Sequence, residues 1–278
     1  MDTTVKEVFS IINDIAPFKL AEDWDNSGLQ VGNFSWHVKK ILVALDVSID
    51  VMNYAAASRF DLIVSHHPLM LSPSKSIDFS IMPGSAIAVA ANHKISVISA
   101  HTNLDKVHGG LNDYFANILG LKNLTALVPS IQLSDKSTNR DNHDGIGRIG
   151  EIEHTVSLKE FALYIKNRLK LETIRITGNP NLPIKKAALC TGSGGSLIKD
   201  FFKSGAAVYV TGDIKYHEAR QIEEAGFGLI DVGHFASERI AVELICKKLQ
   251  KASIENIMNL EIEGFYEDSD PFITLYGI

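Results

Sequence analysis

Two adjacent histidines, His66 and His67, directly follow a short apolar run at residues 62–64. The run contains β-branched residues and is stopped by Pro68, a pattern typical of a buried parallel strand. The histidines would therefore lie at the carboxyl end of that strand, the edge where open α/β sheets bind ligands. Pro68 disfavours helical backbone at His67, so we expect the two imidazoles to diverge to opposite sides. Diverging neighbours are suited to hold one each of two metal ions lying side by side.

Two further pairs of metal-ligating residue types also follow apolar runs. His101 and Asp105 come after residues 95–100, and His234 and Glu238 come after residues 229–232. A spacing of four residues places two side chains on one face of a helix, so His234 and Glu238 should point to the same place. His101 and Asp105 share this spacing, although the residues around them are equally consistent with a loop.

The mixture of imidazole and carboxylate suits Zn, Mn, Fe, Co or Ni, and the absence of cysteine argues against a closed structural zinc site. Two ions about 3.5–4 Å apart would lower the pKa of a bridging water and stabilise charge on a hydrolysed substrate. In this interpretation Glu238 bridges the ions, Asp105 completes one ion beside an imidazole of the pair, and His234 completes the other. The alternative is that each histidine is an ordinary hydrogen-bonded residue, but the shared strand-end placement of all these groups favours a metal site.

The elements that must position these residues alternate between strand and helix. Residues 4–15 predict a first amphipathic helix, and residues 41–100 predict strand, helix, strand, helix, strand, which implies a parallel sheet. The polar stretch 130–147 has no periodicity and is a candidate boundary or lid. The alternation then restarts, with a last long helix at 235–251 and a closing strand at 258–262. We therefore expect an α/β fold of two lobes, residues 1–126 with 228–278 and residues 127–227.

Other stretches have less specific patterns. Residues 22–32 predict a solvated loop with Trp24 packed into the core. The glycine-rich residues 192–195 could cradle a phosphate at a helix start, but they match no phosphate-binding pattern, so a tight turn is favoured. Asp213 is a reasonable N-terminal cap for the next helix, and Lys215 and His217 could equally line a pocket. Cys190 and Cys246 lie in apolar patterns and are interpreted as core residues rather than nucleophiles or disulfide partners.

Composition excludes several classes of protein. The 278 residues carry a net charge of −6, and the lysine pairs are scattered, so dedicated nucleic-acid binding is disfavoured. No apolar segment approaches the roughly 20 residues of a membrane span, and no signal peptide is recognised. We expect a cytoplasmic protein without membrane contact.

Taken together, several motifs resemble the Ngg-interacting-factor-three-like family, whose members are often labelled GTP cyclohydrolase I type 2 homologues. The motifs are residues 24–32 (WDNSGLQVG), 65–69 (SHHPL), 101–105 (HTNLD), 212–213 with His217, and 231–234 (DVGH) with Glu238. The resemblance implies two similar α/β lobes, a dinuclear metal centre in the cleft between them, and a toroidal hexamer. It implies as metal ligands His66, His67, Asp105, His234 and Glu238, with His101 adjacent.

Two functions are consistent with these expectations. The first is a metal-dependent hydrolase with two divalent ions per chain, acting on a nucleotide-like or phosphorylated small molecule, in which His101 shuttles a proton. The second is a ring-forming scaffold or interaction protein that is stabilised by metal and performs no turnover. Some family members carry an inserted domain, but the polar stretch 130–147 is too short to be one.

Overall fold

The structure, a computed structural model, describes residues 3–130 and 143–275. The chain divides into two compact units, residues 1–104 with 241–268 and residues 105–240 with 269–278. These boundaries differ from the predicted ones at 126/127 and 227/228. The difference arises because the strands at residues 122–129 and 228–231 both hydrogen-bond within the sheet of the second unit.

The first unit is built on a five-stranded sheet of order β1-β4-β3-β2-β11. Its strands are β1 (Gly28–Val31), β2 (Lys40–Ala44), β3 (Leu62–Ser65), β4 (Ser96–Ser99) and β11 (Glu261–Gly264). β11, β2, β3 and β4 are mutually parallel, and β1 runs antiparallel to β4. The predicted parallel sheet is therefore confirmed, and the carboxyl ends of β2, β3 and β4 share one edge.

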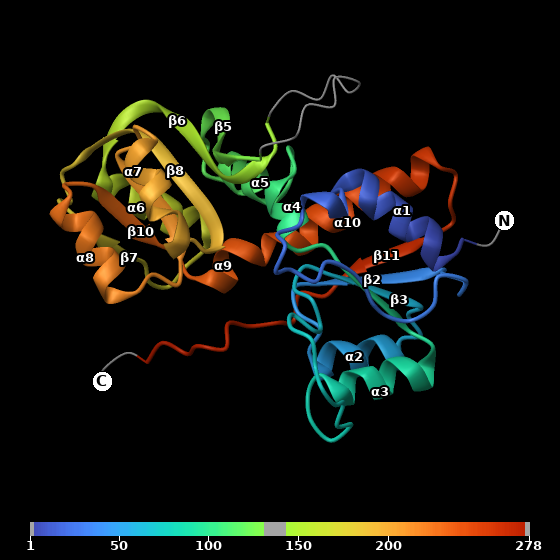
Figure 1. The fold of residues 1–278 in the computed structure, drawn as a ribbon. Coiled ribbons are helices and arrows are strands. Elements are labelled where there is room, and N and C mark those ends of the chain that lie inside the picture. Colours follow the sequence, from blue (N-terminus) through green and yellow to red (C-terminus); the bar gives the residue numbers. More distant parts are fainter. Residues whose placement is uncertain (1–2, 131–142, 276–278) are drawn as a thin grey trace. The chain divides into compact units, whose positions relative to one another are not determined.

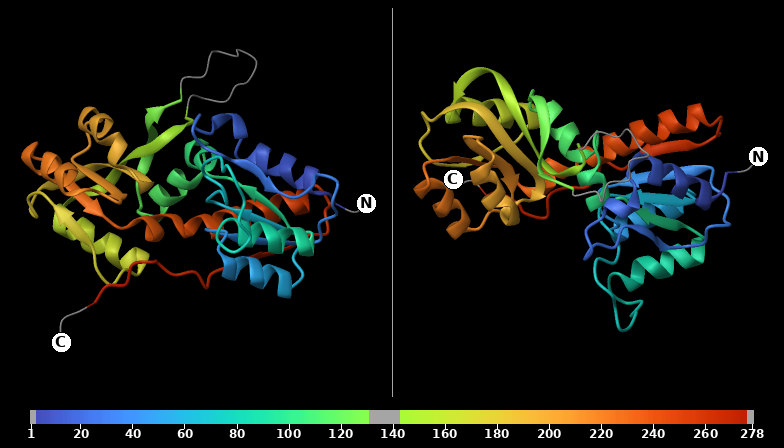
Figure 2. Two further views of the ribbon diagram at one scale, coloured as in Figure 1. Left: turned by 60° about the horizontal axis from the view of Figure 1, so that its bottom comes forward. Right: turned by 45° about the horizontal axis from the view of Figure 1, so that its top comes forward.

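Helices cover both faces of this sheet. On one face lie α1 (Val5–Ile15) and α10 (Ile240–Glu255), and on the other lie α2 (Ile49–Ala57) and α3 (Gly84–His93) (Figure 1). The two views of Figure 2 show the same layers. Leu42 and Ile63 face the α2–α3 layer and pack against Met52 and Ala90, which are fully buried. A short 3₁₀ helix, η1 (Phe18–Leu20), follows α1.

The second unit is built on a six-stranded sheet of order β5-β6-β8-β9-β10-β7. Its strands are β5 (Lys122–Pro129), β6 (Gly145–Ser157), β7 (Arg175–Thr177), β8 (Pro183–Ser193), β9 (Val208–Gly212) and β10 (Gly228–Asp231). β8, β9 and β10 are parallel, and the remaining pairings are antiparallel.

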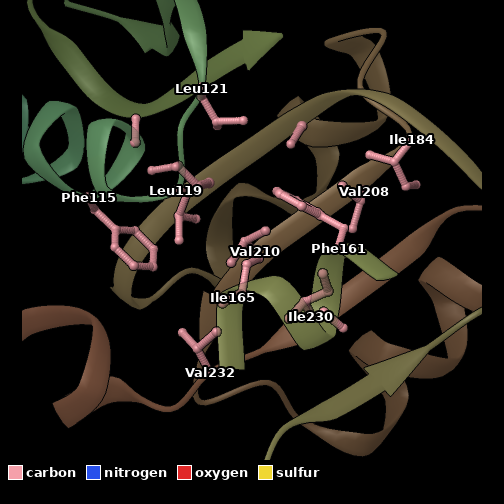
Figure 3. Close-up of a cluster of buried hydrophobic side chains, with 14 of the residues drawn as sticks. Phe115, Leu119, Leu121, Phe161, Ile165, Ile184, Val208, Val210, Ile230 and Val232 are labelled. Atoms are coloured by element: carbon pink, nitrogen blue, oxygen red, sulfur yellow. The ribbon is translucent and has the colours of Figure 1, made fainter. Parts of the chain in front are cut away.

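The helices of this unit also lie on two faces. They are α5 (Leu111–Ile118), α6 (Leu158–Leu169), η2 (Gly195–Leu197), α7 (Ile198–Lys203), α8 (Tyr216–Glu224) and α9 (His234–Glu238). Alternate residues of one strand serve the two faces, as the pleat requires. Val208 and Val210 pack with Phe115 and Phe161 of α5 and α6 (Figure 3), whereas Tyr209 packs with residues of α7 and α8.

Local sequence explains where several helices begin. Thr4 accepts a hydrogen bond from the backbone of Glu7, whose carboxylate accepts from the backbone of Thr4, and Ser157 and Glu160 form the same reciprocal capping box before α6. The predicted helix at 235–251 is instead two helices, α9 and α10, separated at Arg239. No glycine or proline marks that break, so the apolar periodicity runs through it.

Two further predictions bear on the fold. Much of the polar stretch 130–147, the candidate boundary or lid, lies outside the described residues. Among the residues that the structure describes, no helix combines the length and apolar character needed to cross a membrane.

Candidate metal centre

Three histidines gather at the carboxyl edge of the first sheet. His66 and His67 follow β3, and His101 follows β4 and precedes the short helix α4 (Thr102–Lys106). The ring centroids are 5.1 Å apart for His66 and His67, 5.2 Å for His66 and His101, and 5.6 Å for His67 and His101. One ligand atom from each ring lies within 4.8 Å of the others. The predicted meeting of these residues at one sheet edge is confirmed.

The relation between His66 and His67 differs from the predicted divergence. Strand pairing ends at Ser65, so both histidines lie on a bend where the alternation of the pleat no longer applies. Their ligand atoms converge with that of His101, whereas their other ring nitrogens contact different neighbouring segments. The result is a compact set of imidazole nitrogens rather than two that point apart.

Each of the three rings is held by an oxygen acceptor at Nδ1. The acceptors are the Ala100 carbonyl for His66 at 3.0 Å, the Asp46 carboxylate for His67 at 2.8 Å and the Asp25 carboxylate for His101 at 2.7 Å. Because these oxygens only accept, Nδ1 carries the proton and the neutral ring presents a lone pair at Nε2. Histidines that bind metals are oriented in this way by carboxylates and carbonyls.

Asp25 is the most strongly fixed of these acceptors. Its carboxylate accepts hydrogen bonds from the hydroxyls of Thr102 at 2.6 Å and Ser27 at 2.7 Å, in addition to the bond with His101. Burial acts to raise the pKa of Asp25, but the hydrogen bonds from His101, Thr102 and Ser27 outweigh it and hold that pKa well below its usual range. The carboxylate therefore stays ionised at neutral pH and fixes the orientation of the His101 ring through its contact with Nδ1.

The second unit holds three more ligand groups. His234 and Glu238 lie one helical turn apart on α9, and His234 Nε2 is 2.7 Å from Glu238 Oε2. Carboxylate oxygens of Asp105 and Glu238 lie within 4.8 Å of each other. The predicted convergence of His234 and Glu238 is confirmed, and Glu238 is near both of the other two residues. All three could ligate a metal ion through side-chain nitrogen or oxygen.

His234, like the histidines of the first unit, has an oxygen acceptor at Nδ1. Its Nδ1 is 2.7 Å from the Asp213 carboxylate, which leaves Nε2 toward Glu238. The prediction that Asp213 caps the next helix was wrong, because the N-cap of α8 is Lys215. Asp213 instead adopts a φ of 56° at the end of β9, and this backbone conformation accompanies the contact with His234.

Two buried polar residues tie this second set to the end of β8. Asn112 donates to the Asp105 carbonyl at 3.0 Å and accepts from the Thr191 backbone N–H at 3.0 Å. The backbone N–H of the next residue, Gly192, donates to Ser237 Oγ at 2.9 Å, and that hydroxyl donates to the His234 carbonyl at 2.8 Å. The backbone carbonyls of Asp105 and His234 are therefore both linked, through one side chain each, to two consecutive residues of β8.

Gly192 must lack a side chain because of Glu238. A Cβ at this position would lie 2.1 Å from Glu238 Oε1, and the φ of +65° is unfavourable for other residues. Further along the turn, a Cβ on Gly195 would lie 2.8 Å from the Glu218 carboxylate, which would repel a phosphate. The chain passes directly from this turn into η2, in agreement with the favoured tight turn.

The remaining sequence interpretations have mixed outcomes. Cys190 and Cys246 are buried and free, as predicted. Burial raises the pKa of both thiols, which removes them as candidate nucleophiles at neutral pH. The expectation that Trp24 packs into the core was wrong, because its side chain is 62% exposed. Trp24 stands at the tip of a turn, and its ring meets that of His101 edge-on at 6.0 Å.

Sequence reasoning missed the residues that orient the candidate ligands. Asp46 could have been found, since it lies two residues past the end of β2, as His67 does past the end of β3. No such signal marks Asp25, Asn112 or Ser237. Asp25 contacts a histidine far away in the chain, and Asn112 and Ser237 make their hydrogen bonds to backbone groups.

Comparisons with known proteins agree with this architecture. The family model Duf34/NIF3 (NGG1p interacting factor 3) matches residues 3–271, and the chain belongs to this family. A Clostridium acetobutylicum protein named GTP cyclohydrolase 1 type 2 homolog is 34% identical over 272 residues, which cover 98% of this chain and 99% of that protein. A Clostridium perfringens protein of the same name is 35% identical over 266 residues, covering 95% and 98%. The crystal structure of a Staphylococcus aureus hypothetical protein matches with a TM-score of 0.91 at 29% identity, covering 99% of this chain and 100% of that one.

Proposed function

We propose that the histidine set of the first unit and the His234–Glu238 set of the second unit together hold two divalent metal ions. The proposed ligands are His66, His67, Asp105, His234 and Glu238. The observation that carries the proposal is that every candidate histidine has Nδ1 committed to an oxygen acceptor, which prepares Nε2 as a ligand. Ligand chemistry agrees with it, because nitrogen and oxygen donors without thiolate suit Zn, Mn, Fe, Co or Ni.

The proposed activity is hydrolysis of a nucleotide-like or phosphorylated small molecule. Divalent ions bound by these ligands would lower the pKa of a water and stabilise negative charge at the reacting group. His101 lies beside the ligand histidines and is backed by the ionised Asp25, so it is suited to take a proton at Nε2 while Nδ1 donates to Asp25. Glu238, with two carboxylate oxygens, is the residue that we expect to bridge the ions. Relatives named GTP cyclohydrolase 1 type 2 homolog support a nucleotide as the substrate class.

The metal proposal is tested by metal content. Purified protein should contain about two transition-metal ions per chain, and Glu238→Ala should lose most of them. His67→Ala and His234→Ala change different units, so in a shared centre each variant should lower the retention of both ions. If each variant loses only one ion and keeps the other at full affinity, the sets are independent sites. His154→Ala is the matched control, since that side chain is 86% exposed and lies 3.7 Å from the carboxylate of its neighbour Glu153.

A metal-stabilised scaffold is the second candidate function, favoured by the buried network that binds the second ligand set to β8. Turnover separates the two functions. GTP, phosphoesters and small amides should be screened with each metal added back, and activity that is lost in Asp105→Asn supports the hydrolase. Absence of turnover throughout, with metal removal only lowering the melting temperature, supports the scaffold. We also propose assembly as a toroidal hexamer, for which light scattering should give about six times the chain mass.

A further inference from the structure

An exposed tryptophan stands on a rigid turn beside the histidine set. The backbone N–H of Asp25 donates to the Glu22 carbonyl at 2.9 Å, which closes a turn with Trp24 at its tip. Turn tips normally carry glycine or small polar residues. An indole that is 62% exposed at this position buries little apolar surface, so the fold gains little from it.

Both ends of the turn are fastened to one residue. The Glu22 backbone N–H donates to Thr102 Oγ1 at 2.9 Å, and the same hydroxyl donates to the Asp25 carboxylate at 2.6 Å. Thr102 directly follows His101, whose imidazole also contacts Asp25. The backbone of the turn that carries Trp24 is thus held by the same segment that carries His101, while the indole itself stays exposed.

The indole of Trp24 is exposed and is not stacked on the His101 ring. The rings of Trp24 and His101 are inclined by 78°, with centroids 6.0 Å apart, so the two rings meet edge to face rather than stacking. Asp23 and Asn26, one and two positions from Trp24 in the chain, are exposed and polar. A single aromatic face between polar neighbours suits one planar ring, whereas a protein interface normally requires a contiguous apolar patch of several residues.

We propose that Trp24 is the stacking platform for a planar heteroaromatic ring of the substrate, the base of a nucleotide. The proposal rests on the proposed function, and it assigns the part of that substrate which does not react. Tryptophan stacks on any base through its π face and loses little entropy when its position is already fixed. The reacting group of the same molecule would then lie toward His101 and the adjacent histidines.

The test reads binding rather than turnover. Trp36 is the only other tryptophan of the sequence, so Trp36→Phe leaves Trp24 as the single indole emitter. In this background the four nucleoside monophosphates should be titrated, with ribose 5-phosphate as the probe that lacks a ring. We expect at least one nucleotide to quench Trp24 emission and ribose 5-phosphate to leave it unchanged.

Variants made in the native sequence then isolate the ring, with binding measured by calorimetry. Trp24→Leu should weaken nucleotide binding about 5- to 100-fold and leave ribose 5-phosphate binding unchanged, because stacking contributes only to the ring. Trp24→Phe should restore much of the lost affinity. Phe79→Leu is the matched control, since Phe79 is an aromatic residue of the same unit that lies on a loop and is similarly exposed, at 64%.

Three results would overturn the proposal: no response to any of the four nucleotides, equal nucleotide affinity in Trp24→Leu and the native protein, or an equal loss for ribose 5-phosphate. A change of oligomeric mass in Trp24→Leu with nucleotide affinity unaltered would identify Trp24 as an interface residue instead. Metal content and turnover are measured on the same samples, so failure of the hydrolase proposal is seen separately from failure of ring binding.

Discussion

Replacing Gly192 with alanine should separate metal binding from folding. The new Cβ would lie 2.1 Å from Glu238 Oε1, and contacts under 3.0 Å are essentially never tolerated, so the carboxylate must move by at least about 0.9 Å. In well-formed metal sites the metal–ligand distances lie within about 0.2 Å of their ideal values, so a shift of this size should weaken binding. Loss of an orienting group alone lowers metal affinity about 10- to 100-fold, and displacement of the ligand itself should reach at least the upper end of that range.

The effect on stability should be much smaller. The clash involves the far end of a flexible side chain, so the backbone need not shift, and the main cost is about 1–2 kcal/mol for alanine in the left-handed region. Gly226→Ala provides the matched control. Gly226 has a similar φ of +79°, and a Cβ there would meet nothing within 4 Å. Both variants should therefore lose similar free energy of unfolding, and only Gly192→Ala should lose metal.

The assay is competition for Zn²⁺ or Co²⁺ with a chromophoric chelator, combined with urea denaturation of the metal-free proteins. Equal metal affinity in Gly192→Ala and Gly226→Ala, with both variants folded, would refute the argument that Glu238 is a ligand held against Gly192. A Gly192→Ala protein that loses far more stability than Gly226→Ala would show that the backbone, rather than the carboxylate, gives way. Glu238→Gln adds no atom to the site and should still lose metal.

Three further predictions follow from other buried groups. Arg148→Met should lower the free energy of unfolding by about 3–5 kcal/mol in urea denaturation. The substitution leaves the buried carboxylate of Asp113, which lies 2.6 Å from the guanidinium, without its cation. The control Lys159→Met, at an exposed position, should change the free energy of unfolding by less than about 0.5 kcal/mol. Burial raises the pKa of Cys246 to about 11. Because only the thiolate reacts, the rate of reaction of Cys246 with a disulfide reagent should rise about tenfold per pH unit between pH 7 and 9. A reaction rate that is flat with pH would contradict this. Burial and nearby aspartates raise the pKa of Asp268 to about 6; the folded state then binds the proton more tightly, so stability falls as pH rises from about 4 to about 6. Asp268→Asn should remove this fall and gain about 1 kcal/mol at pH 7, a value reduced for partial exposure, and no gain at pH 7 would reject it.

The sequence predicted the positions of the candidate ligands well because they obey a local rule. His66 and His101 each follow an apolar run, and parallel strands align their carboxyl ends at one sheet edge. His234 and Glu238 are related by helical spacing, which is also local. Neither inference needed any knowledge of how distant segments pair, so both could be made from the chain alone.

The division of the chain into two units was harder to predict from the sequence, because it depends on which strands pair with strands far away in the chain. β10 hydrogen-bonds to β9 and β7, which places residues 228–231 with the second sheet. Nothing in the composition of β10 distinguishes it from the strands of the first unit. The break at Arg239 has the same origin, since local propensity favours a continuous helix there.

The residues that orient the ligands show why a motif alone underdetermines a site. Asp213 has the residue type of a helix cap and a position just before a helix, so local chemistry assigns it to capping. In the structure the Asp213 carboxylate instead contacts His234, twenty-one residues away in the chain. Asp25 likewise contacts His101, seventy-six residues away. A carboxylate can satisfy either demand, and only the tertiary fold decides which donor it meets. The pairing of Asp25, Asp46 and Asp213 each with its own histidine is thus information that the structure adds, and it is the feature that most favours metal binding over ordinary structural histidines.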